Sequence, residues 1–162
     1  MFRIPIFVFF ILPISIFGQT HNSYLSFEVG GTGMIASANI GKTLFIHPRY
    51  KIIVQSGLGW SPKMNNQNAK FNIPCQLTCN FGNHEFFFEA GLGGDFLIKK
   101  KSEEGFRDYD LYLTPIVGVR HEMKNWFMRA YISPFYNVTG KSLYDKITGT
   151  VLSFGIAIGL VL

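Results

Sequence analysis

The feature that most constrains this chain is an alternation, every second residue, between large apolar side chains and small or polar ones. Residues 152–162 show it best: leucine, isoleucine and phenylalanine hold the even positions, and serine, glycine and alanine hold most of the odd ones. Successive side chains of a strand point to opposite faces, so the pattern predicts β-strands. It recurs in eight segments, residues 25–30, 34–40, 52–60, 73–81, 86–96, 111–120, 126–133 and 152–162.

The face opposite the apolar one decides the class of the protein. It is rich in glycine and also carries five isolated charges: Glu28, Glu89, Asp95, Arg120 and Arg129. A soluble barrel has its apolar residues inside and its charges outside. A face made of such small, glycine-rich side chains cannot form the exterior of a soluble barrel. An apolar exterior around a polar lumen is the membrane arrangement, and lipid requires the sheet to close. The sequence therefore predicts an all-β fold, an eight-stranded antiparallel transmembrane up-and-down β-barrel.

The links between segments orient this barrel. Links 82–83 and 122–125 are short, whereas 61–70, 99–107 and 137–149 are long and polar. Short periplasmic turns and long extracellular loops alternate in this way in outer-membrane barrels. Two links are expected to break the rule, a short outer link at 31–33 and a long inner link at 42–49. Interfacial aromatic girdles are expected at the two rims, with Trp60, Phe96 and Tyr136 at the outer one and Phe81 and Trp126 at the inner one.

The N-terminus has the pattern of a secretory signal. Arg3 supplies the positive start, Ile4 to Phe17 form an apolar run, and Gly18 is a small residue suited to the position before cleavage. The run is too short, and too interrupted by proline, for a helix that spans a bilayer with ~20 residues. We therefore expect residues 1–18 to be a signal peptide and residues 19–162 to be one barrel domain.

The formal net charge is +5, but the lysines and arginines are scattered or lie in loops. No basic helix or RNA-binding aromatic motif accompanies them, which argues against nucleic acid as a partner. Outer-membrane lipids and lipopolysaccharide are the expected partners, because loop lysines near a membrane gain from its negative surface potential. The barrel is expected to be a monomer.

Several motifs carry a resemblance to a known group. They are Phe27 to Gly33, Ile73-Pro74, Asn80 to Gly82, Thr114-Pro115, Gly118 to Arg120, Phe127 to Ala130, and Ser133-Pro134. With these, residues 19–162 resemble the small outer-membrane barrels of the OmpA/OmpX type, and more specifically an uncharacterised group of such barrels. The resemblance implies an outer-membrane location and no known chemistry. One departure is Leu162, because such barrels usually end in an aromatic residue that the assembly machinery reads.

Small-barrel enzymes that deacylate or palmitoylate lipid A place histidine with serine or aspartate near the outer rim. Here His47, His84 and His121 map to the inner turns, and His21 precedes the first strand. A hydrolytic dyad needs its base within ~3 Å of the nucleophile, so no catalytic residue and no cofactor is expected. His84 and His121 have the parity of lipid-facing residues, so no metal site is expected either. A lipid-modifying enzyme, an acyl hydrolase or acyltransferase, stays open as the alternative function.

The favoured function is an integral barrel that is not a porin, with a structural role or one in which its loops bind a partner. The loops at 65–68 and 99–104 are the expected contact surfaces. Eight strands leave an interior that side chains can fill. We therefore expect a plugged lumen, in which Arg120 and Arg129 pair with Glu28 and Glu89, Asp95 joins the inward charges, and inward glycines at 57, 91 and 118 make space for the arginines.

The two cysteines, Cys75 and Cys79, fall four residues apart on one face of one segment. At the strand rise their Cα atoms would lie ~13 Å apart, beyond the ~7 Å that a disulfide can bridge. The sequence therefore predicts two free thiols that face lipid.

Overall fold

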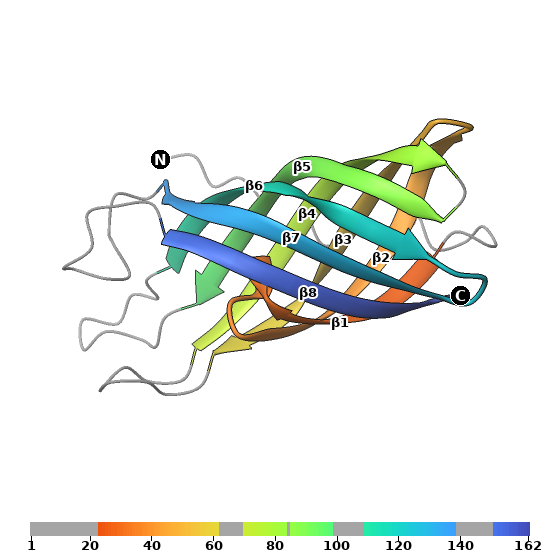
Figure 1. Cartoon of the computed structure of the whole chain (residues 1–162). Helices are drawn as coiled ribbons and strands as arrows, with labels where there is room; N and C mark the ends of the chain where they lie inside the picture. Colours follow the sequence, from red (N-terminus) through yellow and green to blue (C-terminus); the bar gives the residue numbers. More distant parts are fainter. Residues whose placement is uncertain (1–22, 62–69, 84, 99–108, 139–150) are drawn as a thin grey trace, which may run out of the picture.

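The computed structural model describes residues 23–61, 70–83, 85–98, 109–138 and 151–162, and these form a closed barrel of eight antiparallel strands in chain order (Figure 1). The strands are β1 (Ser23–Gly30), β2 (Ala36–His47), β3 (Tyr50–Ser61), β4 (Lys70–Asn83), β5 (Phe86–Ile98), β6 (Tyr109–Glu122), β7 (Trp126–Asn137) and β8 (Val151–Val161). The all-β, up-and-down barrel predicted from the alternation is confirmed. The expected signal peptide and the three long outer links lie largely or wholly outside the described residues.

The end of the barrel where β1 begins and β8 ends is called the inner end here, and the opposite end is the outer end. One prediction about the inner end is wrong. The expected long link at 42–49 is a hairpin with only Pro48 and Arg49 between the paired residues His47 and Tyr50. The register of β2 shifts between Thr43 and Phe45, which indicates a β-bulge. The extra residue breaks the alternation, so the end of β2 does not look like a strand in the sequence.

The first outer link does not project outward as a loop. Residues Gly31–Gly33 form a short 3₁₀ turn, η1, whose three residues are all buried. Gly30 and Gly31 have φ angles of 73° and 63°, and a Cβ on Gly31 would lie 2.0 Å from the Tyr131 hydroxyl. Only glycine fits both demands at Gly31. Met34, expected to start the second strand, precedes it with a φ of 64°, and β2 begins at Ala36.

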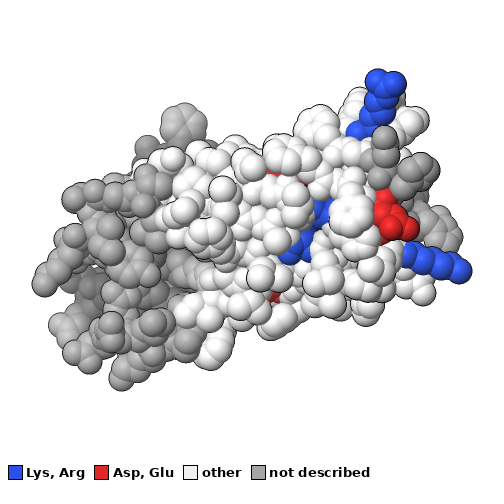
Figure 2. Space-filling model, viewed as in Figure 1, with Lys and Arg blue, Asp and Glu red and all other residues white. Residues whose placement is uncertain are grey.

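The barrel exterior is apolar. Large exposed side chains occupy the outward positions of every strand, for example Phe27, Leu77, Val119 and Phe154. Four of the aromatic residues expected at the rims, Trp60, Phe81, Phe96 and Tyr136, are exposed on this surface, and Trp126 is partly exposed. Figure 2 shows that uncharged residues predominate over the strands, while charged side chains project at the inner end. Among the described residues, no helix is long and apolar enough to cross a membrane. Apolar side chains on the outside and polar side chains on the inside match the arrangement of transmembrane barrels.

Candidate functional site in the barrel lumen

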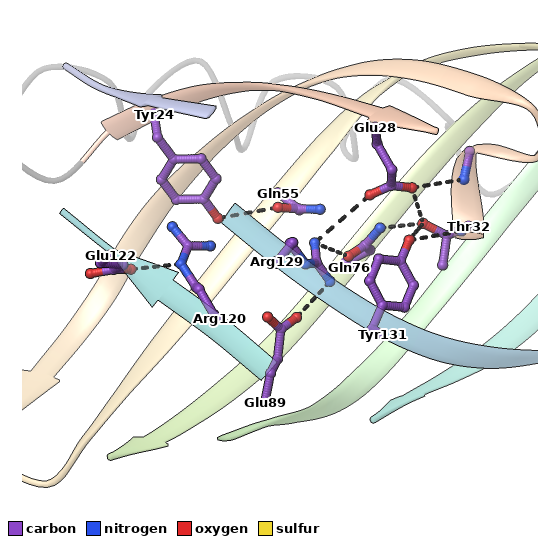
Figure 3. A network of polar contacts seen from close by, with 11 residues as sticks. Tyr24, Glu28, Thr32, Gln55, Gln76, Glu89, Arg120, Glu122, Arg129 and Tyr131 are labelled. Carbon is purple, nitrogen blue, oxygen red and sulfur yellow. Dashed lines mark hydrogen bonds and ion pairs between the residues drawn. The ribbon is translucent and has the colours of Figure 1, made fainter. Parts of the chain in front are cut away.

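The lumen contains the buried polar and charged side chains of the described residues. Its buried polar and charged residues come from η1 and every strand except β8, and all five of the predicted lumen charges are among them, each with at most 3% of its surface exposed. Figure 3 shows the central part of this network. Buried charges need partners, because an unpaired one is costly away from water.

Arg129, on β7, is the centre of the network. One terminal nitrogen donates to Glu89 Oε1 at 2.5 Å, and the other donates to Gln76 Oε1 at 2.9 Å. The second nitrogen also lies 3.9 Å from Glu28 Oε2, and the guanidinium lies 4.3 Å from the centre of the Tyr131 ring. The structure therefore brings Arg129, Glu28 and Glu89 together, and one cation contacts residues of three other strands.

Thr32, in η1, connects the first outer link to this network. Its backbone N–H donates to the Tyr131 hydroxyl at 2.9 Å, and its own hydroxyl donates to Glu28 Oε1 at 3.4 Å. Gln76 donates to the same threonine hydroxyl, and the backbone N–H of Gly33 donates to Glu28 Oε1 at 3.2 Å. The turn is thus held inside the barrel by side chains from β1, β4 and β7 (Figure 3).

Arg120, on β6, takes partners that the sequence did not indicate. Its Nε donates to Glu122 Oε1 at 2.6 Å, and its guanidinium lies 3.6 Å from the centre of the Phe127 ring. Lys51 forms an ion pair with the same glutamate. Arg120 therefore belongs to a second cluster toward the inner end. Its carboxylate partner is Glu122, whereas the sequence predicted Glu28 and Glu89. Glu122 was assigned to a turn in the sequence, although its inward parity matches that of Arg120.

Asp95, on β5, accepts a hydrogen bond from the Asn72 amide nitrogen at 2.7 Å. The same nitrogen lies 3.4 Å from the backbone oxygen of Thr32. The partner of this carboxylate is thus a neutral amide that also contacts η1. Asp95 is joined to the turn through Asn72 and not to either arginine by a direct contact.

The three inward glycines were expected to make space for the arginines, but they do not. A Cβ on Gly118 would lie 2.4 Å from Tyr131 Cβ, and one on Gly57 would lie 2.2 Å from the side-chain oxygen of Asn39. At Gly91 the nearest side chain is Thr78, at 2.7 Å. Neighbouring wall residues use the space, so that prediction is wrong.

The described histidines lie at the inner end and face the exterior. The His47 ring stacks on Tyr50 with centroids 4.7 Å apart, and the His121 ring stacks on Phe86 at 4.2 Å. His21 and His84 lie outside the described residues. Within the described ranges, no group of three or more His, Cys, Asp or Glu residues could hold a metal ion.

No protein-family model matches this chain, and no curated protein matches it. The solved structures do. The N-terminal β-barrel domain of Pseudomonas aeruginosa OprF matches with a TM-score of 0.52 and 15% identity, over 89% of this chain and 100% of that one. Ail, the attachment invasion locus protein of Yersinia pestis, solved with the heparin analogue sucrose octasulfate, matches with a TM-score of 0.44 and 10% identity, over 88% of this chain and 100% of that one.

The likeness to the OprF domain shows the fold, and the likeness to Ail is too low to support an argument about binding. The expected resemblance to small outer-membrane barrels is confirmed at the level of the fold. The chain has the fold of an eight-stranded up-and-down β-barrel, and its apolar exterior fits the hydrocarbon of a membrane.

Proposed function

We propose that this barrel is closed to ions and solutes and serves a structural role, or a binding role carried by its outer loops, and that it is not a porin. The observation that supports the proposal best is the network around Arg129 and Thr32. It joins η1 to β1, β4, β5 and β7 through the middle of the lumen. An eight-stranded barrel is narrow enough for its own side chains to fill.

One further layer of side chains supports a closed lumen on the inner side of this network. Tyr24 and Phe127 pack edge to face with ring centroids 5.2 Å apart, and Ile53 is buried in the same cluster. Arg120 lies over both rings. An ion crossing the barrel would have to displace the buried turn, the Arg129 contacts and this aromatic layer in succession.

Planar-bilayer recording tests the closed lumen directly. The purified full chain is expected to give no large, steady conductance, while a known porin inserted into the same bilayers serves as the positive control. A steady open-channel current from the folded protein would contradict the proposal. Folding of the inserted sample is checked by its heat-dependent gel mobility and by resistance of its membrane fraction to a urea wash.

The binding role would belong to the loops at 65–68 and 99–104, which lie outside the described residues. Replacing each loop by a short glycine-serine link in the otherwise complete protein, followed by pulldown from the cell envelope, separates the two roles. Loss of a specific partner with one replacement supports binding, and an unchanged set of partners with both supports a purely structural barrel.

The proposal contains no catalytic step. His47 and His121 stack on aromatic residues of the barrel exterior, whereas Ser26, Ser37 and Ser133 are buried on the lumen face. A base and a nucleophile on opposite faces of the wall cannot share a proton. Mass spectrometry of lipid A from cells with and without the protein tests this, because any change in acyl chains would favour the lipid-modifying alternative.

We also propose that the barrel has outer-membrane lipids and lipopolysaccharide as partners and that it is a monomer. Light scattering in detergent tests the monomeric state.

A further inference from the structure

The wall between β6 and β7 contains a break in its outer half. Paired residues run from the outer end to Leu113 and Tyr136, and pairing resumes at Val117 and Ile132 with the same register. Residues 114–116 of β6 and residues 133–135 of β7 therefore have no pairing partners across this wall. The neighbouring wall between β5 and β6 pairs without interruption from Phe86 to Ile98.

Two prolines face each other at the centre of this break. The register places Pro115 directly opposite Pro134, and this position is one at which both residues of a pair normally exchange hydrogen bonds. The parity follows from the Val138 N–H, which donates to the Leu111 carbonyl at 2.9 Å four residues along each strand, because bonded and non-bonded pairs alternate. Neither proline has an N–H, so both of the bonds expected there are missing.

The missing bonds leave two carbonyl oxygens, those of Pro115 and Pro134, without the donors that a regular ladder supplies. Proline is normally confined to sheet edges and bulges, and a closed barrel has no edge. In hydrocarbon, backbone groups must be satisfied within the protein or by something that reaches them. Both prolines occupy the outward parity of their strands and are partly exposed, so these oxygens lie in the part of the wall that meets lipid.

A second set of oxygens lies on the lumen side of the same break. Thr114 and Ser133, the residues before the two prolines, are both 0% exposed, and neither hydroxyl has a hydrogen-bond partner in the described part of the chain. Diagonal neighbours on one face of an antiparallel pair lie within reach of a common group. We call residues 114–116 and 133–135 the proline seam.

The lumen behind the proline seam is closed by packed side chains. The rings of Tyr112 and Phe135 meet edge to face with centroids 5.9 Å apart, and Ile116 is 1% exposed. A group that satisfies the seam oxygens therefore has its more direct approach from the membrane side, where the prolines are partly exposed.

We propose that the proline seam is a binding site for a hydrogen-bond donor, a hydroxyl or an amide N–H, carried by an amphiphile of the surrounding outer leaflet. The donor group would satisfy the carbonyls of Pro115 and Pro134 and come close to the hydroxyls of Thr114 and Ser133. The apolar side chains that flank the seam on the exterior, Leu113, Val117 and Ile132, would contact the acyl chain. The site is independent of whether the lumen conducts and of any partner of the loops.

The test compares two lipid probes in bilayers that contain the folded full chain. Both are brominated on the same acyl chain, but one is a monoacylglycerol with two hydroxyls and the other is a methyl ester with no donor. A tryptophan reporter is placed at Ile132→Trp, beside the seam, in a Trp60→Phe, Trp126→Phe background. A matched reporter at Leu77→Trp lies where β4 pairs with β5 without interruption, in a row that leads through Leu92 to Pro115.

We expect the monoacylglycerol to quench the seam reporter more strongly than the methyl ester does, and the two probes to quench the Leu77→Trp reporter equally. The double variant Pro115→Val, Pro134→Val restores both N–H groups and should abolish the preference. It should also fold, because valine suits a strand and the ladder is completed. Pro48→Val, in the inner hairpin, should leave the preference intact.

Equal quenching by both probes at the seam would overturn the proposal, as would a preference that survives in the double variant. Water filling the seam from the lumen side would give that equal quenching, together with faster deuterium exchange at Ile116 than at Val119. Since every readout comes from folded protein in bilayers, a negative result leaves the conductance experiment and its conclusion untouched.

Discussion

Arg120 and Arg129 lie directly opposite each other on β6 and β7, yet they occupy two different environments. Like charges in this position repel, and the two side chains point apart. Arg129 is sealed in the middle of the lumen with carboxylates that are at most 1% exposed. Arg120 points toward the inner end, where its carboxylate partner is 22% exposed and is shared with Lys51.

The difference indicates that position along the barrel, more than charge itself, decides how much each arginine contributes to the stability of the fold. Removing one partner of a sealed ion pair leaves a charge that water cannot reach. A carboxylate near the inner end keeps both water and a second cation. The two arginines, one strand apart, should therefore differ clearly in their contribution to stability.

The largest effect is expected for Arg129→Met, which leaves Glu28 and Glu89 buried without a cation. Breaking a buried pair in this way costs about 3–5 kcal/mol. Urea-induced unfolding in phospholipid vesicles, followed by the gel mobility of folded and unfolded forms, measures the loss. The double variant Arg129→Met, Glu89→Gln should recover part of it, because one of the stranded charges is removed. A single variant as stable as the wild type would show that the network contributes little.

The next effect concerns η1, the turn buried inside the barrel. Gly31→Ala places a Cβ against the Tyr131 hydroxyl and forces a non-glycine residue to a φ of 63°. The left-handed conformation alone costs roughly 1–2 kcal/mol, and the clash adds to it. The same unfolding assay measures the change.

Gly94→Ala is the matched control for the turn, because a Cβ there meets only the Tyr112 backbone oxygen at 3.9 Å. It should unfold like the wild type. If both variants lost equal stability, the effect would come from glycine replacement in general, and the inward position of η1 would not be its cause.

A smaller loss is expected for Arg120→Met. The variant removes the contact with the Phe127 ring, and such cation–π contacts are worth about 0.5–2 kcal/mol. Glu122 keeps its ion pair with Lys51. The double variant Arg120→Met, Lys51→Met should therefore lose more stability than the sum of the single changes, which a double-mutant cycle measures. Strict additivity would contradict the shared role of Glu122.

The sequence predicted the wall of the barrel better than its contents, for a physical reason. The two-residue period fixes which face a side chain occupies, so the inward placement of Glu28, Glu89 and Arg129 could be derived. It does not fix the direction in which a long side chain extends along the barrel. The partner of Arg120 was therefore missed, although extending its strand by two residues at the same parity would have identified Glu122.

The other differences come from features without a local signal. The bulge near Leu44 breaks the alternation, so the pattern predicts a loop where β2 continues as an extended strand. The inward fold of η1 depends on Tyr131 and Gln76, which lie far away in the sequence. The facing of Pro115 and Pro134 depends on the register between two strands, which a single sequence leaves unspecified.

The smallest effect is expected on the barrel exterior, at the cysteines. Cys75 and Cys79 are free and partly exposed on the lipid-facing side of β4, and Cys75 Sγ lies 3.2 Å from the Ser56 hydroxyl. Neither contacts the charged lumen, so Cys75→Ala and Cys79→Ala should each change the free energy of unfolding by no more than about 0.5 kcal/mol, as substitutions away from special features usually do. Their positions four residues apart along one strand place their Cα atoms ~13 Å apart, so mass spectrometry should find two reduced thiols. A charged maleimide added in water should label neither thiol in the folded, membrane-embedded protein and both after unfolding, because the lipid-facing surface excludes the reagent. An intramolecular Cys75–Cys79 bond would contradict the register of β4, and labelling of the folded protein would contradict its outward face.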